Sequence, residues 1–347
     1  MKRQNNLFES IIDYQNIRLA WLKSIKGKRK SSSVLLFSRD VTENLQKIRT
    51  RLISGSPAWG NYRSFVITDP KKRVISAAPF EERIMHHAIM NVLEPLFERQ
   101  LIFHCYACRK GKGTHAAVLY AFHQCKARRF FLKLDARKYF DSIDHEVLKS
   151  QLRHLIKDGR VLYLLFGIID SYQTLLGKGL PIGNLTSQFF ANLYLSSLDH
   201  YALEQLKPAG YVRYMDDFIL WHDDKQVLQT MLESLQAFAI NTLNLELKPP
   251  VLGYAAQGLP FLGFLVKSSG IFLMQKSKRR MSTRAKSIQS DLDTFEISEE
   301  KAAERASSVN AAVMIARSRS FRVNLWKGSG FGHEPCHTRR QLEQQCV

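Results

Sequence analysis

Residues 210–221, with the sequence GYVRYMDDFILW, constrain the fold of this chain more than any other stretch. β-Branched and aromatic residues stand on both sides of a short polar interruption, a pattern that predicts a β-hairpin whose turn carries Asp216 and Asp217. Carboxylate oxygens suit Mg²⁺ and a tight turn fixes their spacing, so the hairpin predicts part of a divalent-ion site. The alternative is an Asp-Asp turn that serves hairpin geometry alone, because aspartate is an ordinary turn residue.

The charge of the chain narrows the choice of partner. Its 347 residues include 51 lysines and arginines against 31 aspartates and glutamates, a formal net charge of +20. Such a balance favours salt-sensitive binding to nucleic acid. No run approaches the roughly 20 apolar residues that cross a bilayer, and the polar N-terminus lacks the apolar core of a signal peptide. We therefore expect a cytoplasmic protein of two or three subdomains without membrane contacts.

The five cysteines are scattered, which fits a reducing compartment. Cys105 and Cys108 form a C-x-x-C, but no second Cys or His pair follows at the spacing of a zinc site. His333, Cys336 and His337 lack a partner pair as well. We therefore expect no metal site built from cysteine or histidine.

Hydrophobic periodicity predicts most of the remaining elements. The expected helices cover residues 7–25, 41–54, 79–98, 115–122, 146–176, 189–198, 225–242 and 298–317, with another, basic helix after residue 275. The expected strands or extended segments cover residues 64–68, 73–77, 130–134, 243–248 and 258–266. The turn at residues 69–72 carries cations that either close over phosphate or are simply solvated.

A second carboxylate stands at a strand end. Asp135 directly follows the predicted strand over residues 130–134, where it is well placed to reach a neighbouring hairpin. The alternative is a cap for the following helix, a role that Asp141 or Ser142 would fill as well.

Two loops suit a phosphate-bearing ligand. The Gly/Pro-rich loop over residues 177–188 enters a helix, and the missing side chain of Gly183 lets the backbone approach a ligand. The Gly/Lys-rich turn over residues 106–114 also opens a helix and suits phosphate, although its spacing is not that of a Walker A loop.

Taken in order, Asp135 before an aromatic segment, the Gly-rich loop and the Tyr-Met-Asp-Asp tip resemble the palm blocks of reverse transcriptases, over roughly residues 60–266. The resemblance implies an α+β fold, that of a right-hand polymerase with fingers, palm and helical thumb. It assigns residues 1–130 to an N-terminal extension and fingers, residues 131–270 to the palm together with finger helices over roughly residues 146–178, and residues 271–347 to a basic helical thumb and tail.

One loop narrows the resemblance further. Retroviral and group II intron enzymes usually carry Gln-Gly and Ser-Pro where this chain has Ile182-Gly183 and Ser187-Gln188. That variant, together with residues 106–115, resembles the reverse transcriptases of diversity-generating retroelements. Such enzymes copy a template-repeat RNA into cDNA with frequent errors opposite adenine, and the cDNA replaces a variable repeat in a target gene.

The resemblance also assigns a catalytic set. Asp135, Asp216 and Asp217 would hold two Mg²⁺ ions, with Mn²⁺ as a substitute, and Asp135 and Asp216 should matter most. Lys248 falls near the block whose lysine is proposed to protonate the leaving pyrophosphate, with a solvated lysine before two prolines as the alternative. Phe140 matches the aromatic steric gate that selects dNTPs over ribonucleotides.

Other positions are assigned to the substrates by resemblance. Two arginines fall in finger blocks that approach the triphosphate, and guanidinium makes charge-assisted bonds with phosphate. With Phe140, the dNTP-binding set is Arg73, Arg109, Ala136, Ile182, Gly183 and Gln188. The set that contacts primer or template is Tyr214, Met215, Phe261, Leu262 and Gly263.

Ile182 carries an expectation about fidelity. Many relatives place a glutamine there that hydrogen-bonds around the nascent base pair, whereas isoleucine contributes only shape and dispersion. Discrimination between right and wrong pairs then lacks a polar check worth about 1 kcal/mol or more. We expect Ile182 and Gln188 to permit misincorporation.

The implied partners are template RNA, a DNA primer, dNTPs and the small basic accessory protein, a pentameric barrel, with which such enzymes work. A group II intron-derived enzyme and a host-defence reverse transcriptase are the enzymatic alternatives. After Val266 about 80 residues remain, enough for a thumb but not for an added endonuclease or RNase H domain. A non-catalytic nucleic-acid-binding scaffold is the third alternative, disfavoured because carboxylates without metal repel phosphate.

Overall fold

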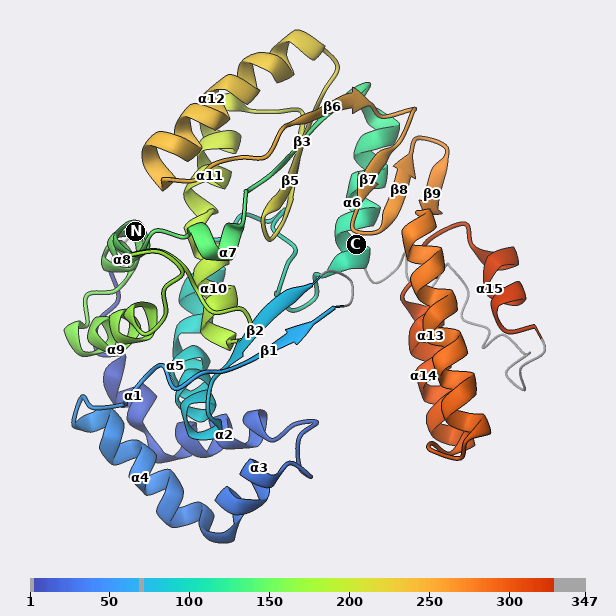
Figure 1. The fold of residues 1–347 in the computed structure, drawn as a ribbon. Coiled ribbons are helices and arrows are strands. Elements are labelled where there is room, and N and C mark those ends of the chain that lie inside the picture. The colour runs from blue at the N-terminus through green and yellow to red at the C-terminus, as the bar shows by residue number, and fades with distance from the viewer. Residues whose placement is uncertain (1–2, 69–71, 328–347) are drawn as a thin grey trace. The chain divides into compact units, whose positions relative to one another are not determined.

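The computed structural model describes residues 3–68 and 72–327. The chain folds as two compact units, each assembled from several stretches of sequence. The first unit contains Met1–Cys108, Asp135–Leu206 and Glu233–Lys248, and the second contains Arg109–Leu134, Lys207–Leu232 and Pro249–Val347. Both units combine helices with strands, so the predicted α+β class is confirmed (Figure 1).

Helices dominate the N-terminal part of the first unit. The single helix predicted over residues 7–25 is wrong, because Asp13 interrupts it. The Asp13 carboxylate accepts hydrogen bonds from the N–H groups of Gln15 and Asn16 and thereby caps a second helix. The helices here are α1 (Phe8–Ile12), α2 (Tyr14–Ser24), α3 (Ser32–Phe37), the 3₁₀ turn η1 (Ser38–Asp40), α4 (Val41–Ile53) and α5 (Phe80–Glu98). The last two confirm the predicted helices.

The helix predicted over residues 146–176 is also wrong. It is replaced by α8 (His145–Leu155) and α9 (Gly159–Asp170), with Asp158 between them. One carboxylate oxygen of Asp158 caps α9, while the other accepts two N–H groups at the start of α1, at 2.9 and 3.0 Å. Burial opposes ionisation of this side chain, but the backbone donors hold the pKa of Asp158 below its ordinary value. Asp158, at the break between α8 and α9, therefore also anchors the start of α1.

The cap of α8 also differs from the prediction. Asp144, rather than Asp141 or Ser142, accepts the N–H groups of Glu146 and Val147. Two helices replace the single helix predicted over residues 189–198. The remaining helices up to residue 243 are α6 (Thr114–Ala127), α7 (Tyr139–Ser142), α10 (Leu185–Tyr194), α11 (Ser196–Tyr201), the π-helix η2 (Ala202–Leu206) and α12 (Lys225–Leu243).

The strands β1 (Arg63–Ile67) and β2 (Arg73–Ala77) form an antiparallel ribbon in the first unit, which confirms the predicted pair. The register pairs Phe65 with Ile75 and Ile67 with Arg73, so these side chains share one face of the ribbon. Residues 69–71 of the predicted cationic turn lie outside the described residues.

The second unit is built on a four-stranded sheet with the strand order β4-β5-β3-β6. The strands are β3 (Phe130–Asp135), β4 (Gly210–Tyr214), β5 (Asp217–His222) and β6 (Val251–Tyr254). β4 and β5 pair in antiparallel fashion, which confirms the predicted hairpin. Trp221, Arg213 and Tyr211 are among the largest fully buried side chains, so this sheet holds the core of the unit.

A second, three-stranded sheet follows in the second unit. The extended segment predicted over residues 258–266 is wrong, because Leu262 and Gly263 adopt positive φ angles of 49° and 88° and turn the chain. The strands are β7 (Leu259–Phe261), β8 (Phe264–Lys267) and β9 (Gly270–Leu273), in that order and antiparallel.

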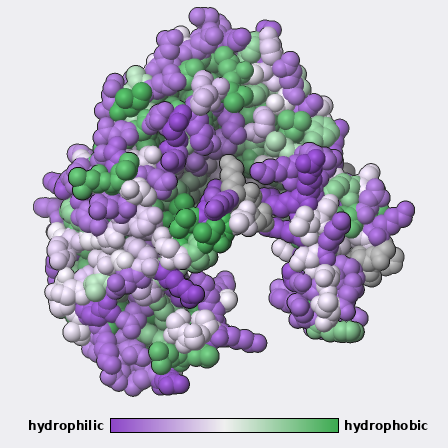
Figure 2. Space-filling model, in the orientation of Figure 1, coloured by the Kyte–Doolittle hydropathy of each residue, from purple (hydrophilic) through white to green (hydrophobic). Residues whose placement is uncertain are grey.

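The C-terminal helices are α13 (Gln275–Asp293), α14 (Glu299–Ala311) and α15 (Arg319–Leu325). They pack around a small core of Ala285, Ile288, Ala302, Ala306 and Trp326. Their outer surface is polar: Figure 2 shows hydrophilic residues over much of α13 and α14. Within residues 3–68 and 72–327, no helix is long and apolar enough to cross a bilayer.

Candidate functional site

The hairpin turn between β4 and β5 contains two residues, Met215 and Asp216, because Tyr214 pairs with Asp217. Met215 adopts a φ of 58°, an unusual conformation for a side chain of this size. The buried Arg213 stabilises it, donating from Nη1 to the Met215 carbonyl oxygen at 3.0 Å. The hydroxyl of Tyr214 lies 3.2 Å from Thr114 Oγ1 at the start of α6. Arg213 was not predicted, because its strand position resembles that of any core residue.

The second carboxylate of the turn is paired with a lysine. Asp217 Oδ2 lies 2.9 Å from Lys133 Nζ, and the two side chains are only 18% and 20% exposed. Lys133 was not predicted. The period-two alternation of a strand places Lys133 on the same face of β3 as Asp135, and this was the one signal in the sequence that pointed to it.

Asp135, the last residue of β3, contacts Lys248 twice. The backbone N–H of Lys248 donates to the Asp135 carbonyl at 2.8 Å, and its Nζ lies 2.6 Å from Asp135 Oδ1. Backbone pairing of Ala136 with Leu247 sets this register. Lys248 is therefore ion-paired with Asp135, but its side chain is 42% exposed, so the choice between a catalytic and a solvated lysine stays open.

The three aspartates supply hard oxygen donors of the kind that divalent ions prefer, and the carboxylates of Asp135 and Asp217 retain 33% and 18% exposure. Their chemistry therefore fits such ions. Asp135 ends β3 and Asp217 begins β5, which are neighbouring strands of one sheet. Across the described residues, no group of three or more His, Cys, Asp or Glu side chains is arranged so that it could hold a metal ion. Metal binding by these aspartates stays a prediction.

The predicted steric gate lies on a short, well-anchored helix. Lys138 adopts a left-handed φ of 44° and turns the chain from β3 into α7, which carries the half-buried Phe140. The Phe140 carbonyl accepts the N–H of Leu180 at 2.8 Å, and the Ile143 carbonyl accepts that of Gly179 at 2.9 Å. These bonds hold the Gly-rich loop beside the aromatic residue.

The same loop contacts β2. The Ile182 carbonyl accepts the Ser76 N–H at 2.8 Å. Gly183 adopts a φ of 123°, and a Cβ there would lie 2.7 Å from Ile75 Cγ2. The close approach predicted for Gly183 is therefore made to β2 of the chain itself. Arg73 lies on the same face of the ribbon as Ile75.

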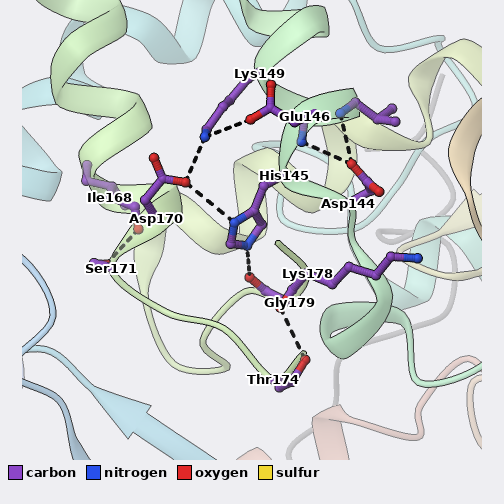
Figure 3. Close-up of polar contacts among 11 residues, drawn as sticks. Asp144, His145, Glu146, Lys149, Ile168, Asp170, Ser171, Thr174, Lys178 and Gly179 are labelled. Atoms are coloured by element: carbon purple, nitrogen blue, oxygen red, sulfur yellow. Dashed lines mark hydrogen bonds and ion pairs between the residues drawn. The ribbon is translucent and has the colours of Figure 1, made fainter. Parts of the chain in front are cut away.

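A polar network fixes the start of this loop (Figure 3). The buried His145 places Nε2 2.8 Å from the Gly179 carbonyl and Nδ1 3.6 Å from Asp170 Oδ1. Asp170 also accepts Lys149 Nζ at 2.7 Å, and Thr174 donates to the Asp141 carbonyl at 2.8 Å. Residues 171–176, predicted to end a helix, instead form a loop held by these hydrogen bonds, on which Leu176 is 93% exposed.

The other predicted residues occupy varied positions. Gln188 is exposed on α10, and Ala136 is fully buried. Arg73 belongs to the first unit, whereas Arg109 is the first residue of the second unit. Phe261 is buried, and the adjoining turn of Leu262 and Gly263 is fixed by Ser277, whose Oγ donates to the Gly263 carbonyl at 2.7 Å.

Several curated proteins are similar to this chain. Protein YkfC of Escherichia coli (strain K12) is 25% identical over 220 residues, covering 51% of this chain and 58% of that protein. The group II intron-encoded protein LtrA of Lactococcus lactis is 22% identical over 267 residues, covering 57% of this chain and 45% of that protein. The putative COX1/OXI3 intron 1 protein of Saccharomyces cerevisiae is 24% identical, covering 45% of this chain and 20% of that protein. The chain therefore spans less than two thirds of the length of these relatives.

Among solved structures, telomerase from Candida albicans in complex with a fragment of telomeric RNA aligns with a TM-score of 0.45 and 13% identity, covering 81% of this chain and 56% of that chain. Residues 68–266 match the family profile described as reverse transcriptase (RNA-dependent DNA polymerase). Because that match takes in more than half of the sequence, the chain belongs to the reverse transcriptase family, and its α+β fold is that of a right-hand polymerase.

Proposed function

We propose that this chain is an RNA-directed DNA polymerase whose substrates are template RNA, a DNA primer and dNTPs. The observation that carries the proposal is the buried β4–β5 hairpin, which presents Asp216 and Asp217 in a two-residue turn within the segment that matches the family. Its neighbour β3 ends in Asp135, which is paired with Lys248. Three carboxylates and one lysine are the groups that nucleotidyl transfer uses.

Reverse transcriptases generally need divalent metal ions. In this proposal Asp135, Asp216 and Asp217 would hold them, and the ions would supply Lewis-acid activation of the primer 3′-hydroxyl and charge neutralisation at the triphosphate. Lys248 holds a proton on Nζ beside Asp135, available to the leaving pyrophosphate. Phe140 excludes a ribose 2′-hydroxyl, and Arg73 binds triphosphate oxygens. The proposal keeps the boundaries of fingers, palm and thumb that the resemblance implies.

We further propose that the enzyme serves a diversity-generating retroelement, with template-repeat RNA as its template and a small basic pentameric protein as its partner. The support is the loop sequence with Ile182 in place of glutamine, on a loop that hydrogen bonds hold beside both Phe140 and β2. An apolar side chain there offers the nascent base pair no hydrogen bond. The difference in binding free energy between right and wrong pairs is therefore smaller.

The test is primer extension on a defined RNA template with Mg²⁺ and dNTPs, followed by sequencing of the product, with and without any small basic protein encoded by a neighbouring gene. Asp216→Asn should slow extension by about 100-fold or more, because several kcal/mol of charge stabilisation is lost. The matched control is Asp223→Asn, since that carboxylate is paired with Arg128 at 2.9 Å on the surface. Equal extension by both variants would contradict the polymerase assignment.

The sequenced products test the finer proposal. Wild-type products should carry frequent errors opposite template adenine, and Ile182→Gln should reduce them several-fold, whereas Ile182→Leu should not. Accurate extension by the wild type would favour the second candidate, an enzyme related to the group II intron proteins with which the chain shares 22% identity.

A further inference from the structure

Lys133 lies at the meeting point of three groups in the second unit. Its Nζ is 2.9 Å from Asp217 Oδ2 and donates to the Pro260 carbonyl oxygen at 2.9 Å. The same ammonium lies 5.9 Å from the centre of the Phe261 ring. Two of the three donors of an ammonium group are thereby directed, one to a carboxylate of the hairpin turn and one to the backbone of β7.

The surroundings make this arrangement specific. The neighbours of Lys133 in β3, Leu132 and Leu134, are buried, and only 20% of the Lys133 side chain is exposed. A cation so largely removed from water is stable only with its partners in place. The lysine therefore holds Asp217 and Pro260 in a fixed relation.

That relation extends to residues expected to contact the primer. Pro260 precedes Phe261 in β7, and the following turn is fixed at Gly263, whose carbonyl accepts Ser277 Oγ at 2.7 Å and the Met274 N–H at 3.2 Å. A short path of charge-assisted and backbone contacts thus connects Asp217 with the turn of Leu262 and Gly263.

We propose that Lys133 is a positioning residue that fixes Asp217 against β7 and competes with a divalent cation for one oxygen of that carboxylate. The inference rests on the polymerase function proposed above. The ammonium group occupies lone pairs of the Asp217 carboxylate that a divalent ion held there would also use, and the two cations would repel, so each would weaken the binding of the other. Removing the lysine should strengthen ion binding while it slows extension, because Asp217 loses its connection to β7. A purely structural role would not move the two measurements in opposite directions.

The test compares the full chain with Lys133→Met, with Lys133→Arg, and with the charge-matched control Lys126→Met, an exposed lysine on α6 whose Nζ lies over Phe122. Titration with Mn²⁺, followed by electron paramagnetic resonance without nucleic acid, should show about three- to tenfold tighter binding for Lys133→Met. Single-turnover extension by that variant should slow about tenfold or more, with an unchanged dissociation constant for primer–template. Lys133→Arg should stay within about threefold of wild type in both measurements, because it keeps a charged donor.

Weaker Mn²⁺ binding by Lys133→Met, or values equal to those of Lys126→Met, would overturn the proposal. Lys133→Gln, which keeps a polar donor without charge, replaces Lys133→Met in the Mn²⁺ titration if the latter does not fold. Failure of the wild type to extend any primer would refute the polymerase function, while the Mn²⁺ titration still tests the competition. If the wild type extends the primer and Lys133→Met has the same Mn²⁺ affinity and extension rate as the wild type, only the role of Lys133 is refuted.

Discussion

At the scale of single residues, the pair of Glu82 and His86 in α5 has the most unusual electrostatics. Their side chains are 3% and 1% exposed, and His86 Nε2 lies 3.6 Å from Glu82 Oε1. Burial raises the pKa of Glu82 to about 7, although the Gly60 N–H and Arg51 favour its ionised form. Burial lowers the pKa of His86 to about 3. The native state therefore keeps a proton on the carboxyl group and leaves the imidazole neutral over most of the acidic range.

These shifts predict a pH-dependent gain in stability for Glu82→Gln. A raised carboxyl pKa contributes stability that is complete below the unfolded value of 4.5 and is lost as the pH rises to about 7. His86 acts in the opposite direction between about pH 3 and its unfolded value of 6.5, but it is present in both proteins and cancels in their difference. Glu82→Gln should therefore match wild type near pH 4.5 and exceed its free energy of unfolding by about 3 kcal/mol at pH 8, measured by urea denaturation.

The adjacent Glu81→Gln is the control for this measurement. Glu81 is 50% exposed and pairs with Arg51 at 2.6 Å, so its replacement should change stability by less than about 1 kcal/mol at every pH. A difference between Glu82→Gln and wild type that does not vary with pH would contradict the assignment of a raised pKa.

At the scale of elements, the Gly-rich loop connects parts of the candidate nucleotide site. Backbone bonds tie it to α7 through Leu180 and to β2 through Ile182, and Gly183 allows the contact with β2. We expect Gly183→Ala to cost about 2–4 kcal/mol of stability, since it adds a Cβ at a φ of 123° and at 2.7 Å from Ile75 Cγ2. The KM for dNTPs should rise with it. Urea unfolding and single-nucleotide extension measure the two effects.

Two comparisons separate the backbone cost from the steric cost. Gly111 has a φ of 70° with nothing within 4 Å of an added Cβ, so Gly111→Ala should cost only about 1 kcal/mol. Adding Ile75→Ala to Gly183→Ala removes the clashing methyl group and should lower the dNTP KM part of the way back to the wild-type value. If the double variant binds dNTPs no better than Gly183→Ala, the contact with β2 does not position the loop.

The elements also show what the sequence predicts well. The hairpin around Asp216 and the ribbon of β1 and β2 were predicted correctly, because strand alternation and turn residues are local signals. The helix breaks were missed: Asp158 looks like any polar residue until its second oxygen meets the start of α1, far away in sequence. Lys133 was missed for the same reason, since its partner Asp217 lies on a different strand of the sheet, whereas Arg213 was missed because its strand position resembles that of any core residue. Sequence pattern and resemblance located the aspartates of the candidate site and Lys248, but not Lys133, the cation that pairs with Asp217.

At the scale of the whole molecule, the formal net charge is +20. Its basic side chains fall into two groups: those paired with carboxylates of the protein itself, and those on surfaces available to a polyanion. Lys47, Arg160 and Lys301 belong to the first group, each within 2.7 Å of a glutamate oxygen. The exposed face of α13 belongs to the second group, with Lys276, Arg279 and Arg280 on adjacent turns of one helix. Charge that is already paired within the protein releases few counterions from a bound nucleic acid.

This division predicts the salt dependence of primer–template binding. Replacing Lys276, Arg279 and Arg280 together by glutamine should reduce the slope of log Kd against log salt concentration by about 2–3, because each lost phosphate contact removes about 0.9 from the slope for a duplex. The matched triple replacement at Lys47, Arg160 and Lys301 removes the same charge and should change the slope by less than about 1. Fluorescence anisotropy at several salt concentrations measures both slopes. Equal reductions in the two triple variants would mean that total charge attracts the nucleic acid, whereas a reduction confined to the α13 variant would identify this helix as a contact surface for the duplex backbone.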